Sequence, residues 1–235
     1  MKTYKSLIVD RIQKGLFNSY IEKRDLNLRF NNYSWVSNYN FVFDELTKLN
    51  GIEGLYVRSF QRHGYKMACI YSSEDKTLFT ICSESKFNKL RNRTAIEKYH
   101  CTDALCLLSC HNGSVVQMNM LGEEVEIETR ENLQLLLKSL IVSFENDFDI
   151  KEYCILSCRF NHSSCELYSI IANYMNKTYD VIKEDKSWNE LLIPNVDLMN
   201  AYDDCEESHD VLAETTIKNK FNIKFKNKKE NIMEN

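Results

Sequence analysis

The chain has 235 residues, a hydrophobic content of 43% and a formal net charge of −4. That length and apolar content are typical of a globular protein that buries a core large enough to fold without disulfides or metals. The six glycines and one proline argue against Gly-rich phosphate loops, collagen-like repeats and long flexible linkers.

Hydrophobic periodicity predicts two helices near the start of the chain. The first covers Tyr4 to Glu22, where apolar residues recur at helical spacing. The second begins at Ser37, a good N-cap residue, and continues to Leu49. Asn50 and Gly51 then provide a stop signal, because both tolerate the backbone that ends a helix.

Strand patterns dominate the next segment. Three short runs rich in aromatic and β-branched residues predict strands at Leu55–Phe60, Lys66–Tyr71 and Thr77–Cys82. The last two runs are separated by a polar connection of the length that a hairpin needs. A short basic helix is expected from Ser85 to Arg93.

The middle of the chain predicts a second hairpin and a helix. The hairpin pairs Asp103–Ser109 with Ser114–Met120 and turns at 111–113, where an Asn-Gly pair favours a tight turn. Alternating polar and apolar residues predict an edge strand at Glu124–Glu128. Thr129 is then expected to cap a helix from Arg130 to Phe144.

The remaining elements complete an α+β interpretation. A strand is expected at Tyr153–Phe160, followed by a helix to Asn176 that Ser163 and Glu166 open as a capping box. We expect one α+β domain over 1–200, an antiparallel sheet flanked by helices, and a weakly ordered charged segment over 201–235.

Cysteine usage and the absence of long apolar runs indicate a cytoplasmic protein. The N-terminal segment differs from a signal peptide because Asp10, Arg11 and Lys14 interrupt its apolar stretch. The longest apolar candidate, Leu133 to Phe144, contains Lys138 and is too short to span a bilayer. The nine cysteines stand mostly in or beside apolar runs, which is typical of reduced thiols acting as small core residues.

Two patterns resemble metal or thiol sites but are better explained as core. Cys106 with Cys110, and Cys154 with Cys158, have even spacing that places both members of a pair on the same face of a strand. Structural zinc sites instead present paired ligands on a tight turn. Sequence-adjacent pairs such as Cys110-His111 point apart on a strand and do not indicate a nucleophile beside its base. No metal and no cofactor is therefore expected.

A metal-dependent nuclease is a further hypothesis. Glu84-Ser85-Lys86, with Asp75 upstream, has the letters of an acidic residue followed by Glu-x-Lys. That chemistry requires the Glu and Lys on a strand, whereas Ser83 is expected to end the strand before them. The signatures of P-loop, dinucleotide-binding, zincin and kinase sites are not present.

The charge distribution gives the clearest candidate surface. The segment from Arg58 to Lys98 contains nine Lys/Arg residues and four acidic residues. This segment therefore carries +5, while the rest of the chain carries −9. Basic residues interleaved with aromatic rings suit phosphate contact and base stacking, although a solvated basic face has the same composition. The candidate binding residues are Arg58, Arg62, His63, Lys66, Lys86, Lys89, Arg91, Arg93, Tyr99 and His100.

Parts of the same region resemble a known family. The residues that carry the resemblance are 62–66, 78–81, Phe87, Tyr99-His100 and 103–105, within roughly residues 35–145. They are similar to an uncharacterised domain family of low-GC Gram-positive bacteria and their prophages, from which Cys101 departs because another aromatic residue is expected there. The resemblance implies that the protein comes from such bacteria or their prophages, and it supplies no catalytic residues.

Three functional hypotheses follow from the sequence. The first is a non-enzymatic intracellular protein that binds an unidentified protein partner, with phage–host conflict as its expected setting. The second is a nucleic-acid-binding protein that uses residues 58–98, and the third is a metal-dependent nuclease. Salt-sensitive heparin binding, divalent-dependent cleavage and recovery of a stoichiometric protein complex distinguish the three.

Overall fold

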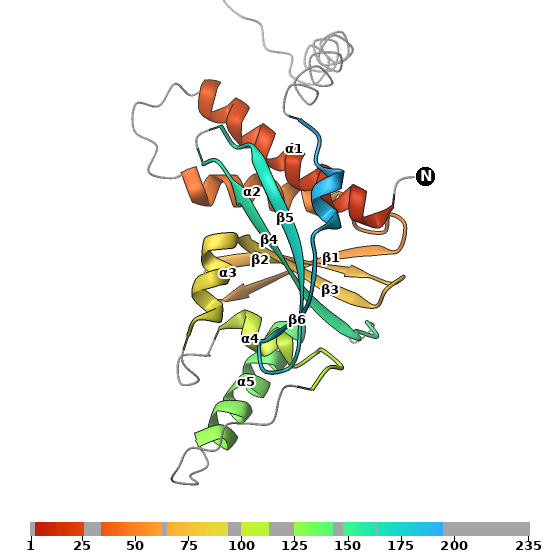
Figure 1. Ribbon diagram of the computed structural model, residues 1–235, viewed down its shortest axis with the longest axis vertical. Coiled ribbons are helices and arrows are strands. Elements are labelled where there is room, and N and C mark those ends of the chain that lie inside the picture. Colours follow the sequence, from red (N-terminus) through yellow and green to blue (C-terminus); the bar gives the residue numbers. More distant parts are fainter. Residues whose placement is uncertain are drawn as a thin grey trace, which may run out of the picture. The chain divides into compact units, whose positions relative to one another are not determined.

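The computed structural model describes residues 3–25, 34–62, 65–93, 100–112, 125–142, 148–162 and 164–194, with the backbone alone at 34–37, 61–62, 65–66 and 125–130. Along the chain, two helices precede the first strand, and three helices lie between the third and fourth strands (Figure 1). The elements are α1 (Tyr4–Asp25), α2 (Ser34–Thr47), β1 (Leu55–Arg62), β2 (Tyr65–Ser72), β3 (Thr77–Ser83), α3 (Glu84–Arg91), α4 (Cys101–Cys106), α5 (Val125–Ile141), β4 (Glu152–Phe160), β5 (Leu167–Met175), β6 (Val181–Asp185) and the 3₁₀ helix η3 (Ser187–Leu191).

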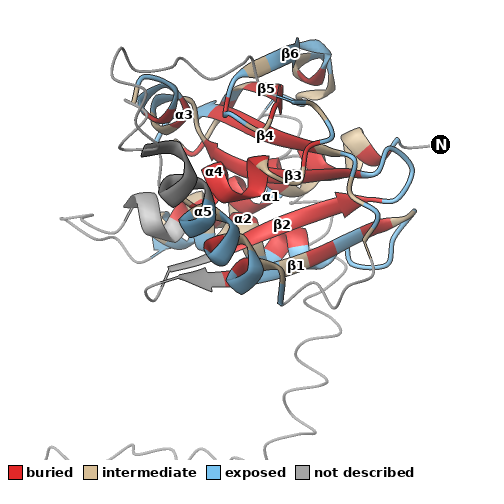
Figure 2. Ribbon diagram, turned by 90° about the horizontal axis from the view of Figure 1, so that it is seen from below, coloured by how far each residue is buried: buried red, intermediate tan, exposed pale blue. Residues whose placement is uncertain are grey.

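The strands form one six-stranded sheet in the order β1-β2-β3-β4-β5-β6. All neighbours are antiparallel except β3 and β4, which run parallel from the Thr77–Glu152 pair to the Ser83–Cys158 pair. A parallel pair needs a long connection across one face of the sheet, and here that connection contains α3, α4 and α5. β3 and β4 are buried on both faces, as their nearly continuous apolar sequences require (Figure 2).

The core therefore consists of two layers, one on each face of the sheet. Alternation along β3 directs Phe79 and Ile81 to one core and Leu78 and Cys82 to the other. The first core is completed by α1, α2 and Trp188 of η3. The second is completed by α3, α4 and α5. Figure 1 shows α1 and α2 on one side of the strands and the other three helices on the opposite side.

The predicted α+β class is confirmed, and so are several of the elements. The first helix, the three N-terminal strands, the basic helix and the strand beginning near Tyr153 all lie where the sequence predicts them. The second helix begins three residues earlier than its predicted cap at Ser37. No helix in the described ranges is both long and apolar enough to cross a membrane.

The predicted hairpin at Asp103–Ser109 is wrong, because Cys101–Cys106 is the helix α4. Its apolar run fits either a strand or a buried helix, and the N-terminal cap decides between them. His100 accepts a hydrogen bond from the Thr102 backbone, and Asp103 accepts one from the His100 backbone at 2.7 Å. These contacts satisfy two backbone donors that only a helix start leaves open. The other half of the predicted hairpin, 114–120, lies outside the described residues.

Two further predictions are wrong for related reasons. The edge strand expected at Glu124–Glu128 is wrong from Val125 on, because α5 begins there; α5 also covers the helix expected from Arg130 as far as Ile141. The helix expected from Ser163 to Asn176 is the strand β5, which pairs with β4 along its whole length. Glu166 does not cap a helix; its carbonyl accepts a hydrogen bond from Asn161 N in the β4–β5 connection. Pairing with β4 outweighs the local capping signal.

The C-terminal end of the described chain is anchored on α1, although its sequence signals are weak. Lys5 forms an ion pair with Asp185 at 2.9 Å and lies over the ring of Trp188, which is fully buried. The amide of Gln13 donates to the Ile193 carbonyl and accepts from the Ile193 N–H. The predicted domain boundary at residue 200 lies outside the described residues and stays a prediction.

The crossing of α1 and α2 depends on Gly15. A Cβ at this position would lie 2.5 Å from Val42 Cα and 2.8 Å from the Phe41 carbonyl oxygen. Both atoms belong to the backbone of α2, so they cannot move aside as a side chain can. We expect Gly15→Ala to destabilise the fold by about 2 kcal/mol or more, because the helices must separate. Urea unfolding measures the loss, and Lys14→Ala, at a half-exposed neighbour, should stay within about 0.5 kcal/mol.

The Lys5–Asp185 pair predicts an acid-sensitive contribution to stability. Burial raises the pKa of Asp185, but hydrogen bonds from Ser187 and Lys5 outweigh burial and lower it from 3.8 to about 2. A depressed folded-state pKa stabilises the fold above the unfolded value and loses that effect as the pH falls through the folded one. The melting temperature of the wild type should thus fall more than that of Asp185→Asn between about pH 4 and pH 2. Parallel curves for the two proteins would contradict this.

Candidate functional site

Helix α3 presents basic side chains of the segment 58–98 to solvent. Ser83 ends β3 and caps α3, its hydroxyl accepting a hydrogen bond from Lys86 N at 3.2 Å. Phe87 and Leu90 are buried and fix the inner face of the helix. The side chains exposed on the outer face of the helix and at its end are Ser85, Asn88, Lys89, Arg91 and Asn92.

The far end of α3 is tied to α4 by Arg93. Its Nη2 donates to both carboxylate oxygens of Asp103, at 2.8 and 3.0 Å, and its Nε donates to the Leu90 carbonyl at 3.0 Å. The Asp103 side chain is only 3% exposed, and it also caps α4 through His100 N. The basic helix is therefore fixed at its start by a cap and near its end by a buried ion pair.

Exposed charges of both signs surround α3. Arg91 lies 3.9 Å from Glu184 of β6, and Arg159 at the end of β4 lies 3.7 Å from Glu84. Arg159 is 64% exposed and falls outside the segment that sequence reasoning selected. Its signal in the sequence was a single charged residue at the end of a strongly apolar strand. We define the α3 surface as the set Glu84, Ser85, Lys86, Asn88, Lys89, Arg91, Arg159 and Glu184.

The structure gathers Lys86, Lys89 and Arg91 on α3 but places Arg58 elsewhere. Arg58 lies on the edge strand β1, where its Nη1 donates to Asn50 Oδ1 at 3.0 Å and to the Val57 carbonyl at 3.1 Å. Its guanidinium also lies 5.7 Å from the centre of the Phe148 ring. Arg58 therefore covers part of an open sheet edge, which is a structural contribution.

The other candidate residues are described to different extents. His100 is the N-cap of α4, with its Nδ1 accepting from Thr102 N at 3.3 Å. The backbone of Arg62 ends β1, and because β1 and β3 point the same way, that end is the one at which α3 begins. Lys66 follows in β2. His63 and Tyr99 lie outside the described residues.

The residues of the hypothetical nuclease site do not come together. Asp75 lies in the turn that precedes β3, where it accepts a hydrogen bond from the Tyr4 hydroxyl. Glu84 and Lys86 follow β3 and belong to α3. Seven strand residues at about 3.3 Å each separate the two ends by about 20 Å, so Asp75 and Glu84 cannot bind one metal ion.

Burial holds four of the core cysteines, Cys69, Cys82, Cys154 and Cys158, as protonated thiols. None of the eight cysteines in the described ranges forms a disulfide. Burial raises the pKa of Cys69, Cys154 and Cys158 above the usual range and that of Cys82 to about 12. Thiolates, not thiols, attack substrates and bind metals. No group of three potential metal ligands occurs among the residues that the structure describes.

The prediction that both members of each cysteine pair lie on the same face of a strand is correct for one of the two pairs. Cys154 and Cys158 face the same core from β4, as predicted. The strand assumed for Cys106 and Cys110 is wrong, because Cys106 is in α4 and Cys110 is exposed beyond it.

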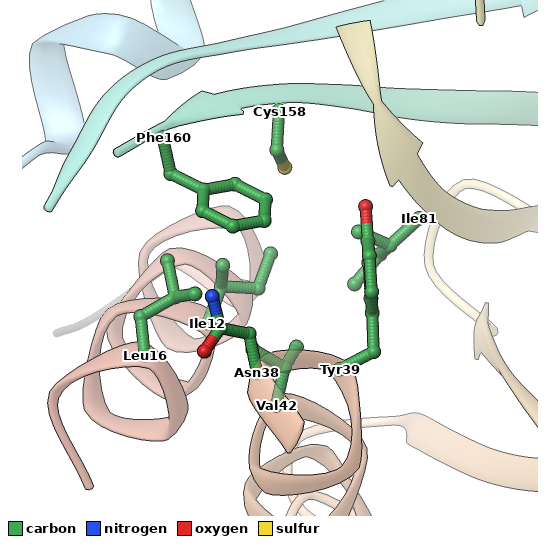
Figure 3. Close-up of a pocket in the computed structure, with 8 residues that line it drawn as sticks. All are labelled: Ile12, Leu16, Asn38, Tyr39, Val42, Ile81, Cys158 and Phe160. Atoms are coloured by element: carbon green, nitrogen blue, oxygen red, sulfur yellow. The ribbon is translucent and has the colours of Figure 1, made fainter. Parts of the chain in front are cut away.

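A small cavity lies between α1, α2 and the sheet (Figure 3). It measures about 10 Å³ and is lined mainly by apolar side chains of Ile12, Val42, Ile81 and Phe160. The fully buried Asn38 directs its amide nitrogen toward it, and that nitrogen has no hydrogen-bond partner among the described residues. A space of this size holds about one water molecule, so it is not a substrate pocket.

Comparison with protein families gives one full-length match. Residues 1–234 match a family of unknown function, DUF5986. The sequence led us to expect an uncharacterised family, and the match extends well beyond the predicted 35–145. Comparisons with curated proteins and with solved structures find no match.

The Arg93–Asp103 pair predicts different effects for neighbouring basic residues. Arg93→Ala leaves a buried carboxylate without its guanidinium and should cost about 3 kcal/mol of unfolding free energy. Lys89→Ala, on the exposed face of the same helix, should change it by less than about 0.5 kcal/mol. Urea titrations of both variants measure the difference, and equal losses would show that Arg93 is not a structural anchor.

Proposed function

We propose that this chain, which belongs to DUF5986, a family of unknown function, is a non-enzymatic binding protein that engages a protein partner in the cytoplasm through the α3 surface. The cytoplasmic location is supported by the free thiols, which persist where the environment is reducing. The low-GC bacterial and prophage habitat suggested by the sequence fits a role in phage–host conflict.

The observation that carries this proposal is the mixture of charges around α3. Glu184 and Glu84 are 42% and 38% exposed, and they lie among the arginines of the same surface. A nucleic-acid backbone would be repelled by both carboxylates, whereas a protein partner can offer opposite charges to each. Charges of both signs therefore favour a protein partner over a polyanion. They also fix the orientation in which that partner binds.

The way α3 is held also favours binding. Its cap at Ser83 and the Arg93–Asp103 pair fix both ends before any partner arrives. A surface that is already ordered loses less conformational entropy on association. The exposed serine and asparagines add hydrogen-bonding groups that suit a polar, specific contact.

Polar and charged residues between 75 and 103 hold structural positions. His100 caps a helix, Asp103 neutralises Arg93, and Asp75 binds Tyr4. Burial raises the pKa of Cys69 and Cys154, which keeps these two thiols protonated and weakly nucleophilic. These assignments support binding over catalysis as the role of this part of the chain.

Nucleic acid is the second candidate. The backbone of Arg62 and the start of α3 lie at the same end of the sheet, so basic residues of the hairpin and of α3 share that end. Basic residues that share one end of a sheet suit contact with a phosphate backbone. Each phosphate neutralised should steepen the dependence of log affinity on log salt by about 0.9 for duplex DNA and about 0.7 for single strands.

A matched pair of charge reversals tests the α3 surface. We expect Lys89→Glu with Arg159→Glu to weaken the complex with the protein partner at least about tenfold, because both charges are exposed and should contact it. Lys14→Glu with Arg24→Glu changes the net charge equally on α1, across the sheet, and should leave affinity unchanged. Affinity purification from a low-GC host identifies the partner, and titration with the purified partner compares the variants.

The binding of the two double variants distinguishes a protein partner from a nucleic acid. Equal binding by both double variants would reject the α3 surface as the site. Binding of DNA or RNA with a steep salt slope, lost in the α3 variant and kept in the α1 variant, would replace the protein partner with a nucleic acid. Circular dichroism establishes that both variants are folded.

A further inference from the structure

The last turn of α1 and the β4–β5 connection bring an amine and a thiol together. Lys23 Nζ lies 3.4 Å from Cys165 Sγ, although the two residues are 142 positions apart in the sequence. Reacting atoms held about 3–3.5 Å apart are at the separation from which bonds form. This contact is separate from the α3 surface, because it lies on the α1 side of the sheet.

Shared hydrogen-bond acceptors hold the two groups side by side. Asn38 Oδ1 accepts from both Lys23 Nζ and Cys165 Sγ, and also from Ser19 at 2.7 Å. The His162 carbonyl accepts from the same nitrogen at 3.4 Å and the same sulfur at 3.8 Å. Two acceptors that serve both donors fix the direction of approach as well as the distance.

The position of Cys165 is unusual in its backbone. Its φ is +54°, in the left-handed region that glycine and asparagine adopt more readily than cysteine. The residue is buried, but its neighbours His162 and Glu166 are exposed or half-exposed, so its sulfur lies just beneath a surface turn. Lys23 is itself half-exposed.

We propose that Lys23 and Cys165 form an oxidation-dependent covalent cross-link with hydrogen peroxide as the oxidant. Peroxide first transfers one oxygen to the Cys165 sulfur; its O–O bond breaks, a sulfenic acid forms and water leaves. Lys23, after releasing its ammonium proton to solvent, attacks that sulfur with its nitrogen lone pair. The S–O bond breaks, a second water leaves and an S–N bond joins the two side chains.

The cross-link would act as a reversible lock between distant parts of the fold. It ties the end of α1 to the start of β5, and a bond between residues so far apart restricts the unfolded chain. A thiol reductant cleaves the S–N bond and restores both side chains. Oxidation would thus stabilise the α1 side of the molecule without a partner cysteine.

Other thiols of the chain provide internal controls. Cys69 and Cys154 are fully buried with raised pKa values and should resist peroxide. Cys110 is exposed and should oxidise, which reports that the reagent is active. Cys110 has no role in the proposed bond.

Peptide mapping of the peroxide-treated full chain tests the proposal. We expect a peptide pair containing Lys23 and Cys165 that is two hydrogens lighter than the sum of its parts and that separates after a thiol reductant. The treated protein should also melt at a higher temperature, and the reductant should reverse this shift. In Lys23→Arg, which keeps a cationic donor, Cys165 should be trapped as the sulfenic acid by a 1,3-diketone probe.

Two outcomes would overturn the inference. One is a wild-type protein in which Cys110 oxidises while Cys165 stays a free thiol. The other is a sulfenic acid at Cys165 that accumulates without any link to Lys23. Both are read on the wild type, so the decision does not depend on the folding of the variant.

Discussion

The parallel pairing of β3 with β4 determines the arrangement of the described molecule. Two parallel neighbours cannot be joined by a tight turn, so the chain must leave the sheet after Ser83, cross one face and return at Glu152. Because both strands are apolar on both sides, each face must also be covered. The crossing helices cover one face, and α1 with α2 covers the other.

The α3 surface follows from that crossing. α3 is the first element after β3, so its inner side must fill the core with Phe87 and Leu90 while its outer side meets solvent. The ends of β4 and β6 lie close enough to add Arg159 and Glu184 to the same surface. Residues from three separate segments thereby form a charged surface with both signs, which suits a protein partner better than a phosphate backbone.

Buried and half-buried polar groups join elements of the fold. Asp103 links α3 to α4, Asn38 links α1 to the β4–β5 connection, and Asp185 links β6 to α1. A buried polar group without a partner is costly, so Asp103 and Asn38 restrict their neighbours to a narrow geometry. The approach of Lys23 to Cys165 is a consequence of this restriction, and it gives the α1 side a chemistry that the α3 side does not share.

The sequence alone determined the α+β class, the first helix, the strands β1 to β4 and the basic helix α3, because periodicity, turn residues and the Ser83 cap act over a few positions. It also placed Lys86, Lys89 and Arg91 on one helix. Tertiary structure decided that Leu167–Met175 is a strand, since pairing with β4 outweighs a local cap. It also decided that Arg58 and Arg93 serve the fold, that Arg159 joins α3, and that Lys23 meets Cys165. Those outcomes depend on contacts between residues far apart in the chain, which no local pattern encodes.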